Sequence, residues 1–468
     1  MCTAHLSVNM KTTFSISKYL PICLFSIIGA WSHDDIQAAS LRFSGDSHPV
    51  MTISPDKSTG LEEVYVVYDT SNFSISYEAS SNNSNVKWYS FSNLGAAFAS
   101  PIENIEVSDN IYTLNDIIPD SGYVIEEGEK RYYFWIVNYA NKRFSVSSLT
   151  SSDLQNCEST IIDFIGEAQP IYYYTINGRS EILTRDISLS YQSLEYDSEA
   201  QQYVQNDYLK SLASVQSSIN IIPPIYCSTE FTITGDKFLR FWNEQISYTS
   251  TTFSPTAVQV KTDAAQEESF TDDSQASNLV PSDTDGLGGS APCTIDFSSS
   301  VTDAVIHNEW QMATDEEFND ITYRINEQDF TYTFTEEGTV FVRFIGSNSD
   351  GSCEAIGDTY TVNIGASILE IPNAFSPNGD GINDEWKVSY RSLTHFKCWI
   401  FDRQGHQLYQ FDDPSKGWDG KHNGKIVKPG VYFYVIEATG SDGKRYKRSG
   451  DINIISYKSS NSSNNIIQ

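Results

Sequence analysis

The chain has 468 residues, with 61 acidic and 30 basic side chains and a formal net charge of −31. Aromatic residues make up 13% of it and charged residues 19%, which is enough apolar material for several cores and excludes wholesale disorder. The length corresponds to roughly three to four domains. Because so negative a surface repels phosphates, nucleic acid and anionic membrane are disfavoured as main partners. The composition indicates an acidic, aromatic-rich extracellular β-protein.

The N-terminus has the pattern of a signal peptide. Lys11 and Lys18 precede an apolar run over residues 19–31, which is too short to span a bilayer but matches the apolar region of an export leader. We therefore expect residues 1–40 to be removed, with translation starting at Met10 and cleavage within residues 30–40. The alternative is an N-terminal anchor. Elsewhere no run approaches about 18 apolar residues, so no transmembrane segment is expected in the mature chain.

Most of the remaining sequence is typical of β-strands. Runs of β-branched and aromatic residues are separated by turn residues, and no stretch keeps a sustained apolar period of 3.6 residues. Short helices are expected within 207–218 and 314–320. Closely spaced strands with polar turns predict an all-β fold of tandem Ig-like β-sandwich domains. The clearest expected strands are 64–68, 73–77, 86–91, 131–137, 171–176, 187–196, 231–234, 340–344 and 360–364.

Composition divides the chain into segments. Residues 262–289 contain seven acidic side chains within 262–285 and no base, which predicts a solvated linker; the alternative is a calcium-collecting acidic tract. Residues 41–367 carry 48 acids and 15 bases, whereas residues 368–458 carry 11 acids and 13 bases. A last module so different in charge is expected to face a different partner. The predicted units are a β-sandwich at 41–150, a second sandwich or a continuation of the first at 151–261, the linker at 262–289, a sandwich at 290–367, a small C-terminal sandwich at 368–457 and a frayed tail at 458–468.

At least one cysteine of the mature chain cannot pair with another cysteine of the same chain. Five remain after the leader is removed, and an odd number cannot pair completely within one chain. Cys293 and Cys353 lie near the two ends of the predicted 290–367 domain, so we expect them to form a disulfide, contributing about 4 kcal/mol on a chain-entropy estimate. Cys398 lies in an apolar strand and is expected to be a buried free thiol.

The last part of the chain carries the most specific motifs. Their glycines permit the positive φ that tight turns need, and residues 432–436 and 452–455 predict a hairpin around the turn at 441–444. Taken in order, the motifs resemble the gliding-motility-associated C-terminal domain, which is the type B sorting domain of the type IX secretion system. The residues that carry the resemblance are Pro372, Asn373, Phe375, Ser376, Pro377, Asn378, Gly379, Asp380, Gly381, Asn383, Asp384, Trp418, Asp419, Gly420, Pro429 and Gly430.

This resemblance implies where the chain goes and what it meets. The leader-cleaved chain would enter the periplasm, and the C-terminal module would then engage the type IX secretion machinery at the outer membrane. The implied location is the cell surface or the extracellular medium. The preceding segment, 290–367, resembles Ig-like or PKD-like repeats through Cys293, Trp310 and Cys353. Upstream of residue 290 no characterised family is recognised.

The glycine-rich segment also suggests calcium. Aligned to an EF-hand loop with Gly381 at the sixth position, it begins at Ser376 and ends at Lys387, so the first carboxylate and the final glutamate are missing. A turn-forming role is one interpretation, and a weak surface Ca²⁺ site through Asp380 and Asp384 is the other. No other cofactor is expected.

Catalytic signatures are absent from the sequence. It contains no GxSxG, Walker or Rossmann motif, and no histidines at zinc-ligand spacing. We therefore predict a non-enzymatic surface protein whose N-terminal domains bind a glycan or protein ligand in adhesion or assembly. The alternative is a secreted hydrolase, a glycoside hydrolase or a protease, that uses carboxylates within 41–261. Candidate sugar-stacking aromatics, which core packing would also explain, are Trp88, Tyr89, Tyr172, Tyr173, Tyr174 and Trp242.

Overall fold

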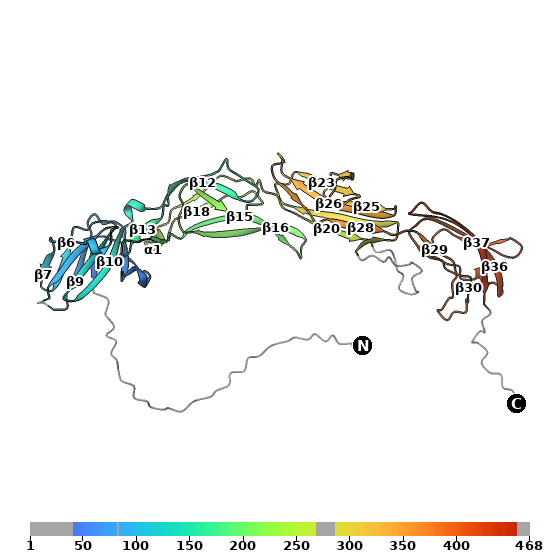
Figure 1. The fold of residues 1–468 in the computed structure, drawn as a ribbon, viewed down its shortest axis with the longest axis horizontal. Coiled ribbons are helices and arrows are strands. Elements are labelled where there is room, and N and C mark those ends of the chain that lie inside the picture. Colours follow the sequence, from blue (N-terminus) through green and yellow to red (C-terminus); the bar gives the residue numbers. More distant parts are fainter. Residues whose placement is uncertain (1–40, 82–83, 268–285, 456–468) are drawn as a thin grey trace, which may run out of the picture.

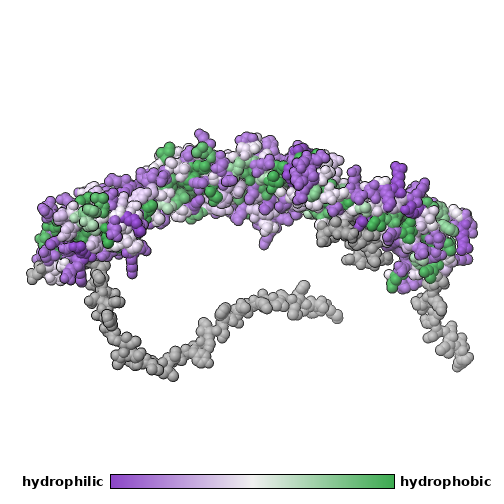
Figure 2. All heavy atoms as spheres, in the orientation of Figure 1, coloured by the Kyte–Doolittle hydropathy of each residue, from purple (hydrophilic) through white to green (hydrophobic). Residues whose placement is uncertain are grey.

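The computed structural model describes residues 41–81, 84–267 and 286–455. The predicted signal peptide and the predicted C-terminal tail lie outside these residues. The described part is an elongated, curved row of β-sandwich domains that follow one another in chain order (Figure 1). Its visible face is mostly hydrophilic, with small hydrophobic areas on each domain (Figure 2). The all-β tandem architecture predicted from the sequence is confirmed.

The first domain packs a four-stranded sheet against a six-stranded one. The smaller sheet has the order β1 (Leu41–Ser44), β4 (Ser74–Glu78), β8 (Ile111–Leu114) and β7 (Glu106–Ser108). The larger sheet has the order β2 (Met51–Ile53), β3 (Glu63–Val67), β10 (Lys130–Asn138), β9 (Ser121–Glu127), β5 (Val86–Phe91) and β6 (Ser100–Ile102). Short 3₁₀ turns lie at Lys57–Thr59, Ala96–Phe98 and Ala140–Lys142.

Strand β10 joins the first two domains because both of its faces are buried. Phe134 and Ile136 point into the core of the first domain, while Trp135 and Val137 point into the core of the second. Successive side chains of a strand face opposite sides, so a nearly continuous apolar run fits a strand covered on both faces. The second unit is thus a domain that shares a wall with the first, and one core runs from Leu61 to Phe253.

The second domain covers the far face of that wall. One sheet contains β11 (Ser145–Ser151), β12 (Thr160–Glu167) and β17 (Ser218–Ile221); the other contains β16 (Gln202–Leu212), β15 (Ile187–Asp197), β18 (Thr232–Thr234) and β19 (Ser247–Thr249). A hairpin of β13 (Ile171–Tyr174) and β14 (Ser180–Leu183) lies against the β10 sheet, where Tyr174 contacts Trp135 at 5.5 Å between ring centroids. The helix α1 spans Lys237–Phe241. The helices expected within 207–218 and 314–320 were wrong, because residues 202–212 pair with β15 in unbroken register and residues 314–320 form bends and turns.

The third domain begins earlier than predicted. Strand β20 (Val260–Gln266) pairs with β22 (Cys293–Val301), and β22 pairs with β25 (Phe330–Phe334). The second sheet orders β21 (Leu287–Gly289), β28 (Tyr360–Ile364), β26 (Gly338–Ser347), β23 (His307–Ala313) and β24 (Ile321–Ile325), with β27 (Glu354–Ile356) also on β26. The linker prediction for 262–289 was therefore wrong at both ends; residues 268–285 lie outside the described residues. Alternation explains the error, since Lys261 and Asp263 are exposed while Thr262 and Ala264 face inward.

The C-terminal module follows without a spacer. Its main sheet has the order β30 (Ala374–Phe375), β37 (Arg445–Ile454), β36 (Gly430–Gly440), β32 (Leu393–Phe401) and β33 (Gln407–Phe411). Two short pairs complete it, β29 (Ile368–Glu370) with β31 (Ser389–Arg391) and β34 (Lys421–His422) with β35 (Lys425–Ile426). The predicted hairpin is present as β36–β37. Across the joint, the Ser392 amide donates to the Ser290 hydroxyl at 2.7 Å, and the Ala291 amide donates to the Ser392 hydroxyl at 3.2 Å.

The disulfide prediction was wrong. Cys353 is bonded to Cys157, in the loop between β11 and β12, and Cys293 is a buried free thiol. Cys293 begins β22, whose nine residues span about 25 Å before the chain reaches the end where Cys353 lies beside Ser347. A disulfide needs Cα atoms within about 7 Å, as in the observed pair at 5.5 Å. The bond therefore ties the second domain to the third. Cys398 is buried and free, as predicted.

A buried ion pair fastens the first domain to the second. The Arg185 guanidinium donates to Asp236 at 2.8 Å and to the Lys142 carbonyl at 2.6 Å, and neither charged side chain is exposed. Asp236 also accepts the Tyr139 hydroxyl at 3.0 Å and the Leu239 amide at 3.1 Å, which caps α1. These bonds connect the end of β10 with α1, so one carboxylate organises the joint.

We predict that Asp236→Ala lowers the free energy of unfolding by about 3–5 kcal/mol, because it leaves the Arg185 charge buried without its partner. The measurement is urea unfolding followed by tryptophan fluorescence. The control is Glu181→Ala, which removes an exposed ion pair with Arg179 and should change stability by less than about 1 kcal/mol. A loss of under about 1 kcal/mol in Asp236→Ala would contradict this assignment.

We further predict that removing the Cys157–Cys353 bond loosens the joint between the second and third domains. The other bonds there are few and polar, such as Asn348 to the Thr256 carbonyl at 3.3 Å. On a chain-entropy estimate, closing the 196-residue separation contributes about 5 kcal/mol. Small-angle scattering of a Cys157→Ser, Cys353→Ser chain should show a broader range of shapes with unchanged circular dichroism. Reducing agent should reproduce this in the natural chain and have no further effect on the variant; unchanged scattering after reduction would refute the prediction.

Candidate functional site

The motif-bearing loop at residues 376–384 is organised by one carboxylate. Asp384 accepts the amides of Asn378 at 2.9 Å, Gly379 at 2.7 Å and Gly381 at 2.7 Å. The bonds from Gly379 and Gly381 are the main cause of a lowered pKa of Asp384, because they stabilise its charged form. Both glycines have positive φ, at 77° and 84°, which a side chain would strain. The loop is thus a turn built around Asp384.

A buried aromatic cluster supports this loop from below. Phe375 is buried, and its ring lies 5.6 Å from that of Trp418. Trp386 and Trp418 exchange backbone hydrogen bonds at 2.9 and 3.0 Å, and the Trp386 indole donates to the Pro372 carbonyl at 2.7 Å. The motif residues at 372–384 and at 418–420 are thereby brought together, although more than 30 residues separate them in the chain.

The remaining motif residues reach the same end of the module. Gly430 pairs with Ile454, which also pairs with Phe375, so the start of β36 and strand β30 flank one strand end. A Cβ on Gly420 would lie 3.0 Å from the Pro377 ring, so a larger residue would crowd that proline. Trp386 was not among the predicted motif residues, although its position two residues after Asp384 is a usable signal.

The calcium hypothesis stays a prediction. Both oxygens of Asp380 already accept hydrogen bonds, from the Ile382 amide and the Asn378 side chain, each at 2.8 Å. Within residues 41–81, 84–267 and 286–455, no group of three or more His, Cys, Asp or Glu side chains is placed to hold a metal ion. Titrating the full chain with Ca²⁺ by calorimetry would test the site.

The six candidate aromatics do not form one platform. Trp88, Tyr173 and Trp242 are buried, and the Trp242 indole donates to the Pro49 carbonyl at 2.7 Å. Tyr89 and Tyr174 are half-buried and pack against the core shared by the first two domains. Tyr172 is the exposed member of the set, at 45%. Core packing accounts for Trp88, Tyr173 and Trp242.

Surface charge sets the C-terminal module apart. Strand β37 and the turn before it carry the exposed bases Lys444, Arg445, Lys447 and Arg448. The nearby acidic residues are Asp442 and Glu437. Lys447 pairs with Glu437 at 3.1 Å. This arrangement gives the module a nearly balanced charge beside a strongly acidic array. No helix in the described part of the chain has the length and apolar character needed to cross a membrane.

Comparison with known families finds two matches. Residues 148–250 match the fibronectin type III domain, in the part of the chain where the sequence analysis recognised no family. Residues 369–454 match the CHU_C type IX secretion signal domain, which confirms the resemblance seen in the motifs. Among curated proteins none matches the chain.

Comparison with solved structures finds likenesses of low sequence identity over much of the chain. They include a tetra-tandem repeat from the extending region of a large adhesion protein, with 11% identity over 83% of this chain and 97% of that one and a TM-score of 0.22. The chicken CNTN1 FN1–FN3 domains show 11% identity over 66% of this chain and 97% of that one, with a TM-score of 0.23. Dimeric latent PorU from Porphyromonas gingivalis shows 8% identity over 70% of this chain and 35% of that one, with a TM-score of 0.15. At such TM-scores these likenesses carry no argument about function.

The loop built on Asp384, the aromatic cluster beneath it and the family match coincide in one module. Such a signal directs export to the cell surface or the extracellular space and implies contact with the secretion machinery. The C-terminal residues 369–454 are therefore a type IX secretion signal domain at the end of a secreted, modular β-sandwich protein.

Proposed function

We propose that this chain is a surface-displayed binding protein, in which residues 41–367 make adhesive or assembly contacts and the C-terminal module directs export. The observation that supports this most is the architecture. An elongated row of sandwich domains, fastened at its joints by the Arg185–Asp236 pair and the Cys157–Cys353 bond, holds its far end away from the secretion module. The recognised domains are of non-catalytic kinds.

The buried charges of the N-terminal domains also favour binding over catalysis. A hydrolase within 41–261 would need carboxylates directed into a cleft. Asp236, which is fully buried there, is instead engaged by Arg185, Tyr139 and the first turn of α1. Its bonds serve the joint between domains, so it has a structural role.

We predict that a chain ending at Ser367 remains in the periplasm, while the full-length chain reaches the surface or the medium. The reason is that the truncated chain keeps its acidic sandwich domains but lacks the secretion signal domain. The measurement is fractionation of the producing cell with immunodetection of each compartment. Export of both chains to the same extent would refute the role of the module, and a periplasmic marker controls for lysis.

We also predict that Asp384→Ala disorders the 376–384 loop and reduces export several-fold. Hydrogen exchange at Asn378, Gly379 and Gly381 should rise at least about tenfold at neutral pH, because these amides lose their acceptor. Asp413→Ala, which removes a carboxylate that caps Ser415 in another loop of the module, is the matched control.

The pH dependence of the loop has a defined sign. Since the pKa of Asp384 is lowered in the folded chain, its stabilisation is complete above the ordinary carboxyl pKa of about 4 and disappears as the pH falls through the lowered value. If the Asp384→Ala chain were exported as well as the natural chain, and if hydrogen exchange of its loop amides were unchanged, the role assigned to this carboxylate would be contradicted.

A further inference from the structure

Strand β16 is an open edge of the fibronectin-type domain. It lies at the end of its sheet, and within the described residues it forms a ladder with β15 alone. With 11 residues it is among the longest strands of the chain. The third domain covers its beginning, where the Ser300 hydroxyl donates to the Gln201 carbonyl at 2.8 Å. The exposed stretch is therefore the later part, residues 205–211.

One hydrogen bond shows which backbone groups point outward along this edge. The Gln192 amide donates to the Thr229 side chain at 2.8 Å, on the side of β15 away from β16. Gln192 and its partner Asp207 are thus a non-hydrogen-bonded pair, so the amide and carbonyl of Asp207 point to the open edge. By alternation, the backbone groups of Gln205, Leu209 and Ser211 point the same way.

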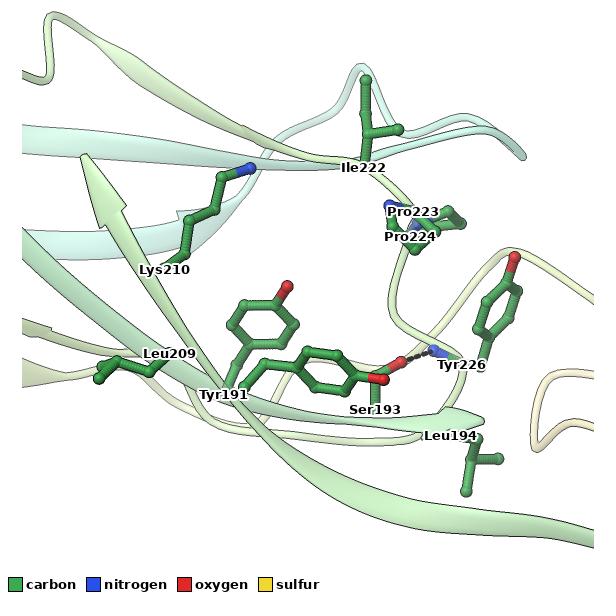
Figure 3. Close-up of a pocket in the computed structure, with 10 residues that line it drawn as sticks. Tyr191, Ser193, Leu194, Leu209, Lys210, Ile222, Pro223, Pro224 and Tyr226 are labelled. Atoms are coloured by element: carbon green, nitrogen blue, oxygen red, sulfur yellow. Dashed lines mark hydrogen bonds between the residues drawn. The ribbon is translucent and has the colours of Figure 1, made fainter. Parts of the chain in front are cut away.

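A slot lies beside this edge, between the two sheets of the domain. Its volume is about 280 Å³. Ile222, Pro223 and Pro224 lie across it from Tyr191 and Ser193, and the Tyr226 amide donates to Ser193 at 3.0 Å (Figure 3). The slot is also lined by Tyr208, Leu209 and Lys210 of β16.

The rim of the slot is apolar and exposed. Ile222, a large aliphatic side chain on this rim, is 66% exposed. Leu209 is 77% exposed on the other face of β16, because alternation turns Tyr208 and Lys210 toward the slot and Leu209 away from it. Tyr191 and Tyr208 stack across the strands with centroids 5.4 Å apart, which gives the floor a fixed shape. Lys210 reaches from β16 to the Asn220 carbonyl of β17, at 3.3 Å, and bridges the two sheets at one end.

An open edge with an adjacent slot matches recognition by strand addition. In that mode the backbone of an extended peptide pairs with the edge, and pockets beside the edge take alternate side chains. Natural proteins protect long edges with charge or proline. Strand β16 contains no proline, and of its two charged side chains Lys210 is directed across the slot to the Asn220 carbonyl, which leaves Asp207. Residues 148–250 carry 13 acidic and five basic side chains, so a neutral or basic peptide is favoured.

We propose that β16 is a docking edge for an extended, neutral or basic segment of another protein, whose bulky apolar side chain enters the slot. This inference rests on the proposed binding function and names the partner class. A single chain segment satisfies the outward backbone groups and covers the exposed Ile222. A neutral sugar would fill the slot but leave the edge unpaired.

The test begins with random dodecapeptides panned on the full-length chain. The tightest peptide should protect the amides of Asp207 and Leu209 from hydrogen exchange, whereas Tyr208 is already protected in the ladder with β15. Leu209→Pro should weaken binding at least about tenfold, because proline removes an outward donor and leaves the β15 ladder intact. Leu209→Ala keeps the donor and is the matched control. Asp207→Pro is a second blocking variant, and circular dichroism checks folding.

Each other outcome overturns the proposal. The proposal fails if no peptide specific for the chain is recovered, or if Leu209→Pro binds the peptide as well as the natural chain does. It also fails if the peptide protects only the amides of other strands. A dimer in sedimentation that Leu209→Pro abolishes would make a second copy the occupant. Glycan binding that Tyr208→Ala alone abolishes would make the slot a sugar site. Cells displaying Leu209→Pro that still adhere normally would remove this edge as the site while leaving the proposed function in place.

Discussion

The two-sided burial of strand β10 is the constraint on which the N-terminal half depends. Its odd and even side chains enter different cores, so the first and second domains are two halves packed on one wall. The buried Arg185–Asp236 pair fixes the second domain to the end of this strand. Replacing either charge would leave the other unpaired in a dry environment, which makes the joint specific in geometry.

Rigidity is distributed along the array in different physical forms. The first joint is a shared core with an internal ion pair, the second is polar and closed by the Cys157–Cys353 bond, and the third is a set of serine hydrogen bonds. Apolar packing resists separation in any environment, whereas the second joint depends on oxidation. An exported protein meets the oxidising conditions that such a bond requires.

The secretion module and the proposed docking edge use backbone groups in opposite ways. In the module, the loop amides of Asn378, Gly379 and Gly381 are satisfied internally by Asp384, which fixes the loop in one shape. On β16, the outward groups of Asp207 and Leu209 have no strand beside them within the described residues. A satisfied loop presents a fixed surface, while an open edge presents pairing capacity to an extended partner.

Local pattern was sufficient for much of this protein. The alternating and continuous apolar runs indicated an all-β fold, residues 131–137 were among the clearest expected strands, and the motif order at 372–430 identified the secretion module. These features depend on residues that are neighbours in the sequence, and on turns whose conformation is set by glycine and proline. The error at 207–218 arose where polar residues within an edge strand obscured its period of two.

Contacts between distant residues were decided by the tertiary structure. Sequence order suggested Cys293 as the partner of Cys353, but the length of β22 places those thiols at different ends of a sandwich and brings Cys157 close instead. Residues 260–266 form a strand because they pair with the edge of β22, and the charged Lys261 and Asp263 among them stay exposed. The slot beside β16 likewise exists because two sheets meet there. By itself the sequence determined the elements and the export signal; which surfaces meet, and which edge stays open, followed from packing over long separations.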